Sequence, residues 1–113
     1  MANTFKVKTK LNVSASAGSP TTVYTVPSST TAVIVGLTLA NTTSNSSSIT
    51  ATVKLENNDG DNITLLKNAP IPAGGSLEVM SGNKIVMEAS DILKAYASAS
   101  SSMDCALSLM EIT

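Results

Sequence analysis

The sequence contains no histidine and no tryptophan, and its only cysteine is Cys105. Without histidine the chain lacks the commonest general base and the commonest protein ligand of transition metals. No serine lies in a G-x-S-x-G motif, which would indicate a nucleophile on a strand-to-helix turn. We therefore expect no catalytic function, no cofactor and no metal site. Cys105 lies among apolar neighbours, so we expect a buried core residue.

Charge is also scarce, because only 13% of the residues are charged and the net charge is −1. Such a chain has no electrostatic footprint for nucleic acid or for an anionic membrane. No apolar run approaches the length that spans a bilayer, and residues 1–10 lack the apolar block of a secretory signal. We expect neither nucleic-acid nor membrane binding. A single cysteine fits folding in a reducing cytoplasm.

Aromatic residues make up 3% of the chain, whereas hydrophobic residues make up 42%. The three aromatic residues are Phe5, Tyr24 and Tyr96. A core built from this sequence must therefore be aliphatic. The length of 113 residues is that of one domain.

Residues 31–41 are the most strand-like segment of the chain, because β-branched and aliphatic residues crowd it. Val33, Val35, Leu37 and Leu39 occupy every second position. Since successive side chains of a strand point to opposite faces, the alternation predicts that these four share the buried face. We expect residues 31–41 to form the central strand of an antiparallel sheet.

Shorter segments with the same alternation occur along the rest of the chain, and turn-forming residues separate them. Eight or nine short strands at this spacing predict an all-β fold, an antiparallel two-sheet sandwich of immunoglobulin-like or jelly-roll type. The expected strands are 5–13, 22–26, 31–41, 49–56, 62–66, 76–80, 84–88, 92–98 and 103–112.

A helix competes with a strand only at residues 89–99, which are rich in alanine and contain Asp91 as a possible helix cap. The apolar residues of 92–98 still alternate, so we expect a strand there. Residues 41–48 are entirely polar and predict an exposed, mobile loop. Residues 68–75 contain two prolines and two glycines and predict a rigid corner.

Residues 57–61 superficially resemble a calcium-binding loop. With Gly60 at the sixth loop position, the first and twelfth positions fall on Leu55 and Leu66, where carboxylates are required. The segment 57–60 therefore predicts a hairpin turn.

The N-terminal segment places apolar residues on one face of a strand and lysines on the other. Rows of lysine are typical of edge strands, so residues 1–20 indicate an edge strand, or an arm over a neighbouring subunit, followed by a flexible linker. Residues 21–113 would form the sandwich domain. The candidate residues for contact between subunits are Phe5, Lys6, Val7, Lys8 and Lys10.

From Val23 onward the sequence resembles small β-sandwich proteins of bacteriophage virions. Residues 24–35 resemble a strand that ends in proline and leads through a small-residue turn into a long β-branched strand, which closes on Leu39-Ala40-Asn41. The resemblance covers Thr21 to Ile112 and departs from the family at Ala89-Ser90, where the family carries proline or glycine. The later matching segments are 65–77, 85–88, Asp91 and 109–112.

The resemblance implies a structural protein of the virion without catalytic residues. It favours a capsid decoration (cement) protein that docks across subunits of the head and is assembled in the host cytoplasm. Its partners would be the major capsid protein or other virion proteins, with a homotrimer as the favoured state. The alternative is a neck or tail fibre or adaptor module that binds a partner protein or a host-surface glycan.

Overall fold

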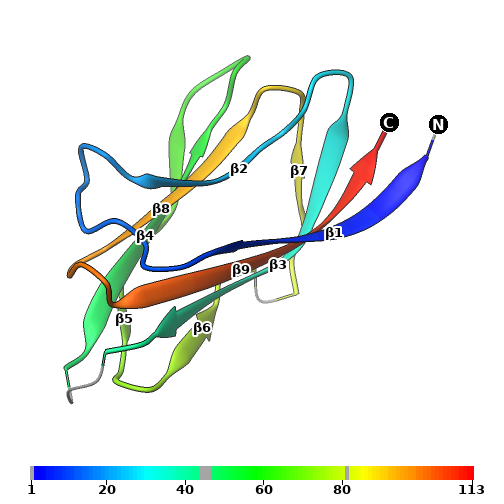
Figure 1. Cartoon of the computed structure of the whole chain (residues 1–113). Coiled ribbons are helices and arrows are strands. Elements are labelled where there is room, and N and C mark those ends of the chain that lie inside the picture. Colours follow the sequence, from blue (N-terminus) through cyan, green and yellow to red (C-terminus); the bar gives the residue numbers. More distant parts are fainter. Residues whose placement is uncertain (1, 44–46, 81) are drawn as a thin grey trace.

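The computed structural model describes residues 2–43, 47–80 and 82–113, and it shows two layers of antiparallel sheet (Figure 1). The described residues form nine strands and no helix. One layer, called here the β1 sheet, contains β1 (Asn3–Lys10), β9 (Met103–Ile112), β3 (Thr31–Asn41), β6 (Ser76–Glu78) and β7 (Ile85–Met87). The other, called the β2 sheet, contains β2 (Thr21–Thr25), β8 (Ile92–Ala97), β4 (Ile49–Glu56) and β5 (Ile63–Ile71).

The strand order is β1-β9-β3-β6 in one layer and β2-β8-β4-β5 in the other, and β7 also pairs with β3. The first and last strands are neighbours, so the N- and C-terminal ends of the chain lie side by side (Figure 1). β6 and β7 both pair with the same side of β3 and together take the position of one strand. Counted in this way, the strand order is that of a jelly roll. The predicted all-β sandwich is confirmed, and the jelly roll is the member of the predicted pair that the topology matches.

The two layers pack through an aliphatic core, as the shortage of aromatic residues requires. β9 shows the alternation most clearly, because Cys105, Leu107 and Leu109 are buried while Ala106 and Ser108 are exposed. The largest fully buried side chains come from both layers and from the segments between them: Ile34, Leu37, Leu39, Ile71, Met87, Leu93, Met103, Leu107, Leu109, Val13, Val26 and Val53.

The alanine-rich segment is a strand, as the alternation predicted. β8 pairs with β4 on one side and β2 on the other. Leu93, Ala95 and Ala97 point into the core. Small side chains fit here because β8 is buried between two neighbouring strands and lies against the opposite layer.

The predicted faces of β3 are wrong in the first half of the strand. Leu37 and Leu39 are buried as expected, but Val33 is only partly buried and Val35 is 38% exposed. The buried residues of this half are instead Ala32 and Ile34.

A β-bulge explains the change of face. The pairing of β3 with β9 shifts between Ile34 and Gly36, so Val35 is an extra residue in the ladder. One extra residue moves all later side chains to the other face, because the side-chain period of a strand is two. The carboxylate of Glu78 accepts the N–H of Leu37 just beyond the bulge, with an N···Oε1 distance of 3.0 Å.

The predicted corner at residues 68–75 begins later than expected, because β5 continues through Pro70. β5 is the edge strand of the β2 sheet, and an edge tolerates a residue without an N–H. The corner itself is a tight turn in which the N–H of Gly75 donates to the carbonyl of Pro72 at 2.9 Å. Gly74, the third residue of this turn, has a φ of 73°, a value that glycine adopts without strain.

The predicted polar loop at residues 41–48 falls partly outside the described residues, which exclude 44–46. Its first residue does not fit the prediction, because Asn41 ends β3 and is buried. The side-chain amide of Asn41 donates to the carbonyls of Ile71 at 3.0 Å and Ser47 at 3.1 Å. A buried amide that satisfies two backbone carbonyls fastens this end of β3 to β5.

The turn before β8 is formed around Ser90. Ser90 has a φ of 73°, and its N–H donates to the carbonyl of Val26. The buried carboxylate of Asp91 accepts the N–H groups of Glu88 and Asn58, both at 2.9 Å. These bonds tie the turn to the hairpin between β4 and β5.

Candidate functional site: the edge strand β1 and the outer face of its sheet

β1 lies at the open edge of its sheet and pairs on one side only, antiparallel with β9. Just outside the two strands, Ala2 and Thr113 exchange backbone hydrogen bonds of 3.2 and 2.9 Å. Because bonded and non-bonded pairs alternate along an antiparallel ladder, the even-numbered residues of β1 bond to β9. The odd-numbered residues, which include Phe5 and Val7, therefore direct their N–H and C=O groups toward the open edge.

The outer side of β1 is apolar in its middle. Phe5 is 75% exposed and Val7 is 64% exposed. Phe5 lies opposite Met110 of β9, which lies opposite Val33 of β3. Val33 in turn lies opposite Val86 of β7, which is 62% exposed. These residues form a line across four strands on the outer face of the β1 sheet, called here the apolar row: Phe5, Met110, Val33 and Val86.

Next to the apolar row, the outer face becomes small and polar. Val7 lies opposite Ser108, and Ser108 lies opposite Gly36 at the bulge. Farther along, a shallow hollow of about 320 Å³ is lined by residues from β1, β3 and β9 and by the exposed Leu11. A sheet face with small side chains in its middle allows another protein surface to approach closely.

The opposite side of β1 carries Lys6, Lys8 and Lys10 and faces the β2 sheet. Together with β2, these lysines line a groove of about 420 Å³ that also includes Tyr24 and Glu111. The predicted separation of lysines from apolar residues is therefore present in β1. Both sides of β1 are largely exposed: the apolar side lies on the outer face of the sheet, and the lysines lie at the open rim between the two layers.

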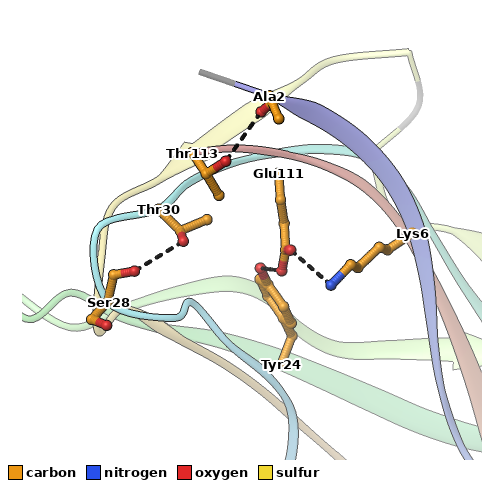
Figure 2. A network of polar contacts seen from close by, with 7 residues as sticks. All are labelled: Ala2, Lys6, Tyr24, Ser28, Thr30, Glu111 and Thr113. Carbon is orange, nitrogen blue, oxygen red and sulfur yellow. Dashed lines mark hydrogen bonds and ion pairs between the residues drawn. The ribbon is translucent and has the colours of Figure 1, made fainter.

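The groove contains a polar cluster in which Glu111 lies between Lys6 and Tyr24 (Figure 2). The hydroxyl of Tyr24 donates to Oε2 of Glu111 at 2.5 Å, and Nζ of Lys6 lies 3.0 Å from Oε1. Glu111 is only 5% exposed, and each of its two carboxylate oxygens has one of these partners. The cluster joins β1, β2 and β9 across the rim of the sandwich.

These contacts shift the titration of both acidic groups. The hydrogen bond from Tyr24, and then that from Lys6, hold the pKa of Glu111 below its ordinary value. Burial raises the pKa of the Tyr24 hydroxyl, and its bond to the Glu111 carboxylate raises that pKa further. The cluster therefore favours a charged carboxylate beside a neutral phenol.

The segment after β1 is fastened to the body of the protein. Asn12 turns the chain with a φ of 53°, and its N–H donates to the carboxylate of Asp104 at 2.9 Å. Val13 is fully buried, and its N–H donates to the carbonyl of Met103 at 2.8 Å. The N–H of Ser14 donates to Oγ1 of Thr21. β1 is thus attached along β9 and anchored again at its C-terminal end.

The predicted contact residues divide between two surfaces. Phe5 and Val7 belong to the outer face, whereas Lys6, Lys8 and Lys10 belong to the groove. Their contact with another subunit stays a prediction. The sequence did not reveal the other members of the apolar row, because the local alternation of residues does not determine how distant strands pair.

Glu111 is a residue that the sequence could have revealed. It continues the inward alternation of Cys105, Leu107 and Leu109, so its position already indicated a carboxylate on the core side of β9. A buried carboxylate requires partners, and lysine and tyrosine are natural ones.

The sequence also raised the questions of a metal site, a membrane span, the single cysteine and the segment 57–60. Within residues 2–43, 47–80 and 82–113, no group of three acidic, cysteine or histidine side chains could hold a metal ion. No helix in the described part of the chain could cross a membrane. Cys105 is buried, as predicted, and burial raises the pKa of its thiol to about 11. The segment 57–60 is a turn closed by the N–H of Gly60 on the carbonyl of Asn57.

No family model and no curated protein sequence matches this chain. Among solved structures, it is similar to a subunit from Bacillus endospore appendages, described as a family of disulfide-linked pili. That similarity has a TM-score of 0.55 and 10% identity, and it covers 99% of this chain and 87% of the other. A protein from the infectious bursal disease virus Gx strain matches with a TM-score of 0.47 and 16% identity over 96% of this chain and 33% of its own length. The appendage subunit and this chain share a fold.

Proposed function

We propose that the protein is a structural component of a bacteriophage virion, a capsid decoration protein bound to the outside of the head. The resemblance of residues 21–112 to phage virion proteins supports this assignment, and so does the jelly-roll fold. The appendage subunit with the same fold belongs to an assembled pilus, and jelly rolls are common in viral capsids. The role would be mechanical, without a chemical reaction.

The observation that carries the proposal is the apolar row. Four neighbouring strands present Phe5, Met110, Val33 and Val86 along one line of a sheet face, next to the exposed Val7. A contiguous apolar patch on a protein with few surface charges favours association, and docking would remove the patch from water. The predicted contact strand, with Phe5 and Val7, supplies one end of this surface.

The proposed partner is the major capsid protein, and a homotrimer at a three-fold position is the favoured arrangement. A stable specific interface buries about 800 Å² on each partner, whereas a weaker contact suffices when it is repeated around a closed shell. Symmetry of the head would repeat one modest contact at every equivalent position. The buried Cys105 is unsuited to a disulfide between subunits.

The test is binding to empty heads of the phage that encodes the chain, measured by co-sedimentation. The variant Phe5→Ser/Val7→Ser should lose binding, whereas Ile63→Ser, an exposed apolar residue on β5 of the other sheet, should bind normally. Unchanged binding of the double variant would refute docking through this face. Copy number then separates the two roles: hundreds per virion indicate decoration, and six or twelve indicate the neck or tail alternative.

A further inference from the structure

We propose that the open edge of β1 accepts an extended segment of a partner protein as an added strand, and that this segment alternates apolar with acidic side chains. The inference rests on the proposed function, because it names the chemistry of the partner segment that covers β1. It follows from three features of the edge: its backbone, its two faces and its lysines.

The backbone of β1 offers a complete row of hydrogen-bonding groups. β1 is eight residues long and has one paired neighbour, β9. The N–H and C=O groups of Phe5 and Val7 point away from β9, as the bonds between Ala2 and Thr113 fix the alternation. Such an edge is a template for β-strand addition, in which the main chain supplies hydrogen bonds and alternate side chains supply specificity.

The two faces of β1 dictate the alternation of the incoming strand. Residues placed beside Phe5 and Val7 would lie on the outer face and extend the apolar row, so apolar side chains fit there. Residues placed beside Lys6 and Lys8 would lie over the groove. In the described part of the chain Lys6 pairs with Glu111, while Lys8 and Lys10 have no ion-pair partner. Carboxylates on the incoming strand would supply ion-pair partners for Lys8 and Lys10.

The same lysines disfavour a second copy of the chain at this edge. In an antiparallel β1–β1 pair, a register centred near the middle of the strand places Lys6 opposite Lys6 or Lys8 of the other copy. Like charges directly opposite each other destabilise a sheet. The strands at the far edge of the sheet, β6 and β7, are three residues each and place Leu77 and Ile85 on the side that would face lysine. The charge pattern therefore selects an acidic partner strand.

The experiment uses the full-length protein and two synthetic peptides, acetyl-TVEVEVEVT-amide and acetyl-TVKVKVKVT-amide, with binding measured by fluorescence anisotropy. We expect the glutamate peptide to bind at least about tenfold more tightly than the lysine peptide, and high salt to weaken it. Lys8→Glu/Lys10→Glu should reverse the preference. Lys67→Glu, on the edge strand β5 of the other sheet, should leave it unchanged.

Hydrogen exchange identifies the mode of binding without any substitution. The amides of Phe5, Val7 and Thr9 should gain protection when the glutamate peptide binds, whereas the even-numbered amides already bonded to β9 should change little. Equal affinity for the two peptides, absent protection at the odd-numbered amides, or a β1-mediated dimer without peptide would overturn the inference. Head binding by a protein that ignores the peptides would remove this inference and leave the proposed function intact.

Discussion

β1 and β9 are hydrogen-bonded neighbours in one sheet, yet they place their apolar side chains on opposite faces. β9 buries Cys105, Leu107 and Leu109 against the β2 sheet. β1 exposes Phe5 and Val7 to solvent and turns its lysines toward the rim between the layers. The two strands differ in what covers their inner sides: a complete second layer for β9 and an open groove for β1.

The contrast shows which apolar residues serve the fold and which do not. The apolar face of β9 is explained by the core that it fills, because burial of aliphatic surface is the main driving force for folding. The apolar face of β1 contributes little to that core. In the proposed function a partner covers this face, and the candidate interface therefore begins there.

The largest expected effect comes from placing the same charge in the two strands. Leu107→Asp should unfold the protein, because an unpaired buried charge costs several kcal/mol against a total stability of about 5–15 kcal/mol. Val7→Asp should remain folded, since Val7 is largely in solvent. Far-UV circular dichroism with thermal melting distinguishes the two, and an unfolded Val7→Asp would mean that β1 belongs to the core.

β3 is the other neighbour of β9, and its bulge places Ile34 in the core and Val35 on the solvent side. Ile34→Ala should lower the free energy of unfolding by about 2–5 kcal/mol, because it leaves a cavity in a packed core. Val35→Ala should change it by about 0.5 kcal/mol or less, since this residue lies at the bulge on the solvent side. Urea titrations measure both, and equal losses would be incompatible with the bulge.

Glu111 is the point at which β9 and β1 are joined, and its effect should be intermediate. Glu111→Gln should cost about 1.5–3 kcal/mol at neutral pH, the usual value for a hydrogen bond to a charged group. The pKa of Glu111 is lowered by folding, so its contribution is complete above the unfolded pKa of about 4.3 and is lost as the pH falls through the folded value. The difference in unfolding free energy between wild type and Glu111→Gln should therefore shrink below about pH 4.

Tyr24, in the same cluster, should make the stability depend on pH in the alkaline range. The pKa of Tyr24 is raised by folding, so its contribution is complete below the unfolded pKa of about 10 and is lost as the pH rises beyond that value. Tyr24→Phe should remove this alkaline loss while the protein stays folded at pH 7. An alkaline loss of equal size in Tyr24→Phe would assign the effect to other groups.

The smallest expected effect on stability belongs to the exposed end of the apolar row. Phe5→Ser/Val7→Ser should change the unfolding free energy by about 0.5 kcal/mol or less per site, because both side chains are mostly in water. The same variant should bind less of a hydrophobic dye than the wild type, which fluorescence measures. A loss of several kcal/mol would show that these residues stabilise the fold itself.

The sequence was sufficient for the fold class and for most strands, because alternation is local and β9 and β8 show it without interruption. It was insufficient at Val35, where one extra residue reverses the faces while the alternation of aliphatic residues continues through Val33, Val35, Leu37 and Leu39. It also could not place Phe5 and Val7 in solvent. The alternation pattern of a strand is the same whether its apolar side faces the core or the solvent. Only the position of the strand in the sheet decides which of the two it faces.

The pairing of Ala2 with Thr113 has a consequence for engineering the molecule. A short linker from residue 113 to residue 2 would turn β9 and β1 into a hairpin, and new ends could be opened in the turn at residues 57–60. In such a circular permutant, purification tags would be attached at the 57–60 turn and not beside β1. Fusions before residue 2 or after residue 113, by contrast, emerge at that same corner and would crowd whatever binds the edge.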